Sequence, residues 1–161
     1  MSPGFGWTRD FYFCAMTQAS LFAPEAELLP AALSDFFPGL ETAGSHHFRV
    51  ARKIGWFRST SLDIYLRTLT DHEADLSAML LTMRGIVAEL PAQQPEKQQA
   101  LLQRIETTQL ALAFSSDSLS AFEDDLFRLA TRLNGFLLVD RVVWYDGHRN
   151  LLIDNMGYSG R

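Results

Sequence analysis

Cysteine is almost absent from this chain, because Cys14 is the only one among its 161 residues. A single thiol excludes an intramolecular disulfide, and it also excludes a zinc site built from several cysteines. Cys14 lies in an apolar run, where a cysteine behaves as a small hydrophobic residue. We therefore expect an inert thiol in the core.

The sequence also has no long apolar segment. A transmembrane helix needs about 20 consecutive apolar residues, and no stretch of this chain approaches that length. The opening Met-Ser-Pro-Gly-Phe-Gly lacks the basic region and apolar segment of a signal peptide. These absences predict a cytoplasmic protein that has no membrane partner.

Positive charge is in deficit. The chain has 14 Lys and Arg residues against 19 Asp and Glu residues, and its net charge is −5. Binding to nucleic acid depends on Lys and Arg side chains that neutralise phosphates, so the balance predicts no nucleic-acid partner. Hydrophobic residues make up 47% and charged residues 20%, which is typical of a globular protein. We expect one α+β domain that covers residues 1–161.

Catalytic and cofactor-binding motifs are missing as well. The chain has no H-E-x-x-H or C-x-x-C metal spacing, no G-x-x-x-x-G-K-[ST] phosphate loop and no G-x-S-x-G elbow. The segment Ser115-Ser116-Asp117-Ser118 lies where a strand is expected to meet a helix, and cap and turn formation explains its composition. The sequence therefore predicts no cofactor.

Histidines are the remaining candidates for a metal site. Neighbours on a strand point to opposite faces, so His46 and His47 would not chelate one ion if both lie in a strand. His72, with Glu73 or Asp75, could add ligands only if the fold brings these groups close together. We expect solvated histidines at the ends of elements and no bound metal.

A helix near the C-terminus has clear start and stop signals. Ser120 and Glu123 fit a capping box at its first turn. Asn134-Gly135 ends the helix, and glycine there can adopt the left-handed conformation that closes it. Apolar residues between these signals recur at helical spacing, which predicts one buried stripe.

Apolar runs flank this helix at residues 108–114 and 136–139. Such a strand–helix–strand unit predicts two parallel strands joined by a right-handed crossover. Two further runs, at residues 142–145 and 151–153, are separated by Asp146-Gly147. An Asp-Gly turn between apolar runs predicts a β-hairpin.

The first two thirds of the chain alternate strands with helices. We expect strands at residues 11–16, 48–56 and 62–67, a short helix at residues 30–37, and longer helices that start near Thr70 and Pro95. Thr70 and Glu73 fit a second capping box. The two longer helices form either an αα-hairpin or one helix broken at Pro91.

Over residues 9–115 this is the βαββαβ order of a ferredoxin-like split motif. The later residues extend it by a helix, a strand and the C-terminal β-hairpin. The predicted fold class is therefore α+β with a mixed sheet. The tail around residues 133–147 has a bacterial character, but it carries no family motif.

The C-terminal hairpin holds the strongest candidates for chemistry. His148, Asp146 and Arg149 lie at its turn, beside Trp144 and Tyr145, and such a set suits acid–base chemistry or phosphate binding. The same residues also have a plain explanation, since Asp-Gly forms the turn and turns face water.

Two functions follow from these observations. The first is a non-catalytic protein-binding module, such as a small acidic adaptor, inhibitor or immunity-type protein, which an acidic surface would steer toward a basic partner. The second is a hydrolase-like enzyme of unrecognised type that uses His148, Asp146 and Arg149. A homodimer through a strand edge is compatible with both.

A pocket lined by those three residues would favour the enzyme, and an exposed apolar surface would favour binding. Most aromatic residues, including Trp56 and Phe57, are expected in the core. Two tryptophans exposed on one face would make a partner site the leading hypothesis.

Overall fold

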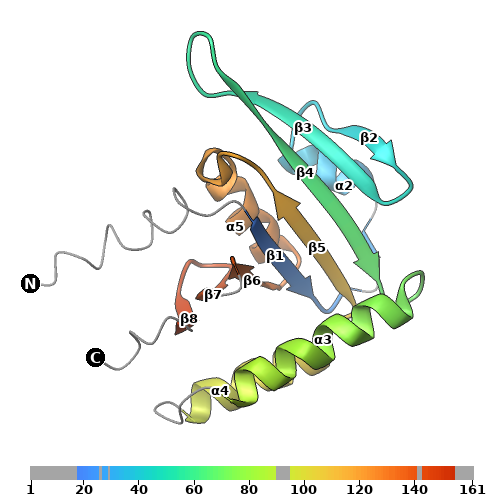
Figure 1. The fold of residues 1–161 in the computed structure, drawn as a ribbon, viewed down its shortest axis with the longest axis vertical. Coiled ribbons are helices and arrows are strands. Elements are labelled where there is room, and N and C mark those ends of the chain that lie inside the picture. The colour runs from blue at the N-terminus through green and yellow to red at the C-terminus, as the bar shows by residue number, and fades with distance from the viewer. Residues whose placement is uncertain (1–17, 26, 29, 90–94, 141–142, 155–161) are drawn as a thin grey trace, which may run out of the picture.

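An eight-stranded antiparallel sheet is the frame of the computed structural model, which describes residues 18–154 except 26, 29, 90–94 and 141–142. The order across the sheet is β2-β3-β4-β5-β1-β6-β7-β8, and every neighbouring pair is antiparallel (Figure 1). The strands are β1 Gln18–Ala23, β2 Glu41–Gly44, β3 His47–Lys53, β4 Ser59–Thr68, β5 Leu110–Ser115, β6 Phe136–Val139, β7 Val143–Asp146 and β8 Leu151–Asp154. The described helices are α2 Pro30–Phe36, α3 Glu73–Ala88, α4 Pro95–Glu106 and α5 Glu123–Arg132, and the 3-10 helix η1 Leu119–Phe122 precedes α5.

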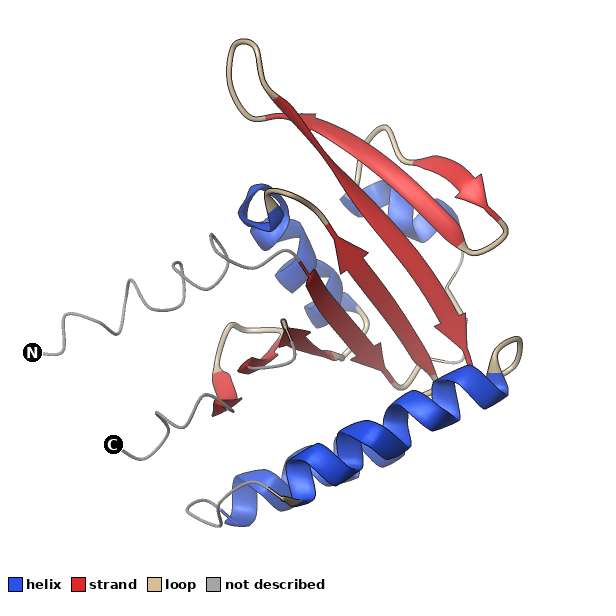
Figure 2. Ribbon diagram, viewed as in Figure 1, coloured by secondary structure: helices blue, strands red, loops and turns tan. Residues whose placement is uncertain are grey.

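Helices cover the sheet on both faces, but not along its whole width. On one face, α2 and α5 pack on β1 and β3–β7, and Leu33, Phe37 and Leu129 are fully buried there. On the other face, α3 and α4 pack on β1, β5, β6 and β7 around Phe22 and Trp144. Figure 2 shows α3 and α4 lying across one end of the sheet, so none of the described helices covers the opposite end of β3 and β4 on this second face.

The two longer helices form an αα-hairpin, which decides between the two predicted alternatives. They pack side by side, and Gln98 donates a hydrogen bond from Nε2 to the carbonyl oxygen of Val87 at 2.6 Å. An ion pair of 3.3 Å joins Arg84 to Glu106. Pro91 itself lies outside the described residues.

The α+β class is confirmed, but the sheet is not mixed. The strands on either side of α5 are β5 and β6, and both pair with β1, which lies between them. They therefore run in the same direction without pairing with each other. The ferredoxin-like order is not confirmed, since β4 pairs with β5 and the sheet continues beyond β1.

Two strands lie where none was predicted. Residues 17–29 carry too mixed a pattern to indicate a strand, yet β1 is the central strand and Leu21 and Phe22 are fully buried. The expected strand at residues 11–16, with Cys14, lies outside the described residues. Glu41–Gly44 forms the edge strand β2, whose residues are all exposed.

Neither predicted capping box forms. α5 begins at Glu123 itself, after η1, and α3 begins at Glu73 after His72, in both cases without a side-chain cap. Both helices do carry acidic residues in their first turn, where negative charge interacts favourably with the helix dipole. At α3 the turn is held differently, because the hydroxyl of Thr68 accepts a hydrogen bond from the amide of Asp71 at 3.1 Å.

α5 ends where predicted, but Asn134 and not Gly135 takes the left-handed conformation, with φ 53°. The amides of Gly135 and Asn134 donate to the carbonyl oxygens of Ala130 and Thr131, at 2.8 and 3.2 Å. This is a Schellman closure with asparagine at its left-handed position. Glycine is required next to it for another reason, since a Cβ on Gly135 would lie 2.5 Å from the carbonyl oxygen of Phe22.

Candidate functional site

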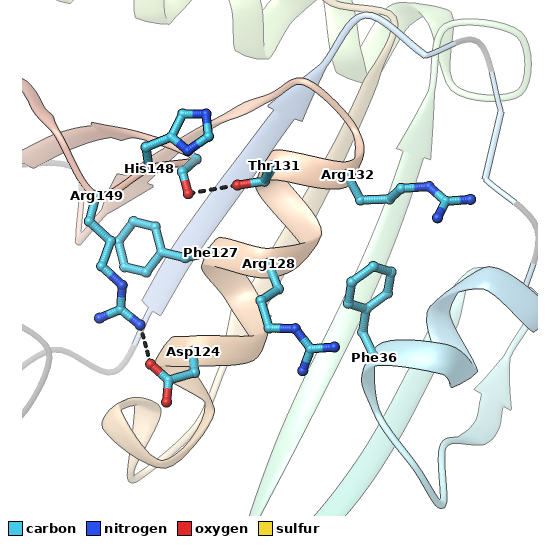
Figure 3. A pocket seen from close by; sticks show the side chains of 9 residues that line it. Phe36, Asp124, Phe127, Arg128, Thr131, Arg132, His148 and Arg149 are labelled. Carbon is cyan, nitrogen blue, oxygen red and sulfur yellow. Dashed lines mark hydrogen bonds and ion pairs between the residues drawn. The ribbon is translucent and has the colours of Figure 1, made fainter.

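The loop of the C-terminal hairpin, residues 147–150, borders an open groove of about 660 Å³ (Figure 3). The groove lies along α5, with α2 on its other side. We call it the C-terminal groove, and its lining residues are Phe36, Asp124, Phe127, Arg128, Thr131, Arg132, Gly147, His148 and Arg149. Two of the three predicted catalytic candidates, His148 and Arg149, line it.

Asp146 does not line the groove, because it builds the loop. Its Oδ1 accepts hydrogen bonds from the amides of His148 and Asn150, at 2.8 and 2.9 Å. Its Oδ2 accepts a third from the side-chain amide of Asn150 at 2.9 Å. Burial alone would raise the pKa of Asp146, but these hydrogen bonds outweigh it and hold the pKa below the ordinary 3.8. A lowered pKa makes this carboxylate a weaker base, whereas general acid–base catalysis works best with a pKa near the operating pH.

Arg149 is held in place by α5. Its guanidinium pairs with Glu123 at 3.0 Å and with Asp124, and it lies 4.8 Å from the ring centroid of Phe127. Burial alone would lower the pKa of Arg149, but the two carboxylates outweigh it and raise the pKa. With φ 67°, Arg149 also makes the turn that the sequence assigned to Asp146-Gly147.

The loop is docked closely onto α5. The hydroxyl of Thr131 donates to the carbonyl oxygen of Gly147 at 2.7 Å, and a Cβ on Gly147 would lie 2.8 Å from the amide nitrogen of Thr131. Of the predicted candidates, His148 alone has an exposed side chain without a hydrogen bond to any described residue. A catalytic role for His148, Asp146 and Arg149 stays a prediction.

The other histidines lie at the end of the β3–β4 pair where β3 begins and β4 ends. His46 lies 3.6 Å from Asp71, and its ring meets the edge of His72 at 4.3 Å between centroids. His47 bonds Asp63 at 2.8 Å and stacks on Tyr65. The fold therefore brings His46 and His72 together, which the sequence could not show. Within the described part of the chain, no group of three or more His, Cys, Asp or Glu residues is arranged to hold a metal ion.

Asp63 lies at the centre of a charged row on the sheet. Its Oδ1 accepts from His47 and from the Nε of Arg49, both at 2.8 Å. Burial alone would raise the pKa of Asp63, but the hydrogen bonds and the charge of Arg49 outweigh it and lower the pKa. This row is a satisfied network on the sheet surface.

The serine-rich segment after β5 forms a turn, as predicted. The buried hydroxyl of Ser116 accepts from the amide of Ser118 at 3.1 Å and lies 3.2 Å from the hydroxyl of Thr60. Its oxygen is thus used in the fold.

The β3–β4 hairpin ends in a turn where the sequence predicted the continuation of a strand. The predicted strand ran to Trp56, but β3 ends at Lys53 and the chain turns back at residues 54–58, which we call the aromatic tip. The amide of Ile54 donates to the carbonyl oxygen of Arg58 at 3.0 Å and closes the turn. Trp56 is 93% exposed and Phe57 is 98% exposed. Figure 1 shows that this turn projects away from the rest of the molecule.

The hairpin that carries the tip is anchored near its outer end. Arg52 interrupts the apolar pattern of β3, and its guanidinium pairs with Asp125 at 2.6 Å and donates to the carbonyl oxygen of Ala121 at 2.7 Å. It also lies 4.7 Å from the ring centroid of Phe122. These contacts tie β3 to η1 and α5 and fix the direction in which the tip points.

A comparison of the chain with protein-family models, with curated proteins and with solved structures found no significant match. Among the helices that the structure describes, none has the length and apolar character needed to cross a membrane.

Proposed function

We propose that the protein is a non-catalytic protein-binding module, of the adaptor, inhibitor or immunity type, and that it contacts its partner through the aromatic tip. The observation that carries this proposal is the exposure of two adjacent aromatic side chains, Trp56 and Phe57, at a projecting turn.

The exposed side chains of Trp56 and Phe57 do not help to stabilise the fold. Burying an apolar side chain such as Phe contributes about 1.5–3 kcal/mol to stability, and neither aromatic side chain at the tip makes that contribution here. Trp and Tyr are enriched among the residues that dominate binding energy at protein interfaces. Arg52 ties the end of β3 next to the tip to η1 and α5, so less of the hairpin has to be ordered when the tip binds.

The alternative is a hydrolase-like enzyme at the C-terminal groove, and the groove itself is the observation in its favour. Its polar groups support it less well. Asp146 is used by the loop amides and Arg149 by two carboxylates of α5, so His148 has no carboxylate arranged as its partner among them. A general base needs a second group that orients it and a place for substrate between them.

The test is affinity capture from a lysate of the source organism with the wild-type protein and two variants. Trp56→Ser with Phe57→Ser removes the tip's aromatic surface. Leu81→Ser is the matched control, because Leu81 is also an exposed apolar residue, 68% exposed on α3. We expect one stoichiometric protein with the wild type and the control and its loss with the tip variant. Equal capture by all three proteins would contradict the proposal.

A further inference from the structure

The β3–β4 hairpin differs in charge from the rest of the molecule. Residues 47–68 hold five of the chain's 14 Lys and Arg residues but only one of its 19 Asp and Glu residues. That one acid, Asp63, is already bonded to His47 and Arg49. The remainder of the chain is correspondingly more acidic than the net charge of −5 suggests.

Two of these cations flank the exposed aromatic residues. Lys53 precedes the aromatic tip and Arg58 closes it, and both are exposed. Neither makes an ion pair with any residue that the structure describes. Two exposed aromatic side chains therefore lie between two positive charges that have no ion-pair partner among the described residues. This combination suits an apolar pocket with an acidic rim.

From this arrangement we infer that the aromatic tip docks into an apolar pocket on a partner protein whose rim carries carboxylates. The inference rests on the proposed function and reverses one expectation from the sequence, since the overall acidity predicted a basic partner. The local charge of the contacting surface decides which partner is attracted at close range, because salt screens charges more than about 8 Å apart at physiological ionic strength.

The surface next to the tip can enlarge the contact. Along β3 and β4, alternate side chains face away from α2 and α5, and we call this side of the pair the open face. It carries Arg49, Ala51 and Lys53 on β3 and Ser61, Asp63 and Tyr65 on β4. Small side chains at Ala51 and Ser61 leave room for a partner, and the face runs unbroken into the tip. A stable interface buries about 1,200–2,000 Å², and the open face supplies area that two aromatic side chains alone do not.

A membrane surface fits the molecule less well. Each basic residue near an anionic leaflet contributes about 1 kcal/mol, and the acidic remainder of the chain would oppose that gain. A second copy of the chain also fits poorly at the C-terminal groove. Arg128 and Arg132 line that groove, so it would repel a tip flanked by Lys53 and Arg58.

For the test, the partner protein that the wild type captures is purified, and its binding to the immobilised chain is measured. Lys53→Glu is compared with Lys97→Glu, which makes the same change in net charge at an exposed position on α4, and both are compared with Trp56→Ser, Phe57→Ser. Association rates are recorded at about 0.05 M and about 0.5 M salt. Vesicles of phosphatidylcholine with phosphatidylserine, and sedimentation of the chain alone, are run in parallel.

We expect Lys53→Glu to slow association by roughly tenfold at low salt and Lys97→Glu to leave it unchanged within about twofold. Loss of the two aromatic side chains should weaken the affinity by more than about thirtyfold. If the aromatic variant loses binding while Lys53→Glu and salt have no effect, the acidic rim is contradicted and the proposed function stands.

If neither the aromatic nor the charge variant changes the affinity, both proposals fail together. Vesicle binding that the aromatic variant abolishes, without a stable protein complex, would replace the protein partner with a membrane. Self-association that Lys53→Glu abolishes would make the occupant a second copy of the chain. Each of these two results overturns the inference.

Discussion

The aromatic tip and the loop of the C-terminal hairpin are both turns between two antiparallel strands, but they differ in how their side chains are used. In the loop, Asp146 accepts three hydrogen bonds and Arg149 makes two ion pairs. At the tip, Trp56 and Phe57 are almost completely exposed. In its residue types the loop resembles an active site. In its apolar sequence pattern the tip resembles a buried strand.

The difference teaches that residue type is a weaker guide to function than the state of each group in the fold. A polar group that already bonds its neighbours is part of the structure, because breaking those bonds costs stability. An apolar group left in water has a favourable contact still to make.

Among the substitutions in loops and turns, the largest effect is expected at Gly135, where the chain enters β6. Gly135→Ala places a Cβ 2.5 Å from a backbone oxygen of β1, which cannot move without disturbing the central strand. We expect the free energy of unfolding to fall by about 3 kcal/mol, at the upper end of the cost of overpacking. Chemical denaturation measures this change.

Gly85→Ala is the matched control for that variant. Gly85 lies inside α3 with open space where its Cβ would be, so alanine should raise the free energy of unfolding by up to about 1 kcal/mol. Two substitutions of the same kind should thus have opposite signs. If Gly135→Ala loses no stability, the approach of Gly135 to Phe22 is misplaced.

The next effect concerns the loop. Asp146→Ala removes the acceptor of three hydrogen bonds in a partly exposed site, and we expect a loss of about 1–2 kcal/mol in the free energy of unfolding. Asp117→Ala, at an exposed aspartate without a hydrogen bond or ion pair to the described residues, should change it by less than about 0.5 kcal/mol. Equal effects of the two substitutions would mean that Asp146 does not build the loop and is available for other chemistry.

Acid should weaken both regions of satisfied charge. The pKa values of Asp63 and Asp146 are lowered by their hydrogen bonds, so each carboxylate stabilises the fold above its unfolded pKa near 3.8. That stabilisation is lost as the pH falls from about 5 through the lowered pKa values. We measure the free energy of unfolding by urea denaturation at pH values from about 5 downward. It should fall less steeply with pH in Asp63→Asn and in Asp146→Asn than in the wild type. Curves parallel to the wild type would contradict the two assignments.

The smallest effect on stability is expected at the tip. Trp56→Ser with Phe57→Ser should change the free energy of unfolding by less than about 0.5 kcal/mol, because neither side chain is packed. Trp144→Ala, at a fully buried tryptophan, should cost about 3–5 kcal/mol. A destabilisation of the tip variant by more than about 1 kcal/mol would mean that its aromatic side chains belong to the core.

Much of the local structure could be predicted from the sequence. The apolar run at Phe136–Val139, the proline start of α2 and the alternation in β4 all correspond to observed elements. These signals are local, since each depends on the spacing of neighbouring residues. The position of β1 between β5 and β6 could not be predicted, because strand order is set by packing between residues distant in the chain.

The candidate site shows the same division. The loop was located correctly and its polar residues were named, but their hydrogen bonds run to α5 and within the loop. The tip was missed because Ile54 and Trp56 continue the apolar alternation of β3, which is the pattern of a buried strand. The available signal was Gly55 between them, together with Lys53 and Arg58, because glycine in a strand pattern often marks an interruption.

The most direct test of the contrast is one quantitative capture experiment on three proteins: the wild type, Trp56→Ser with Phe57→Ser, and His148→Ala. His148 has an exposed side chain in the C-terminal groove, and its loss should leave the fold intact. The account predicts that a single partner protein is retained by the wild type and by His148→Ala and is lost with the tip variant. Retention by the tip variant and loss with His148→Ala would contradict it and would place the function at the C-terminal groove.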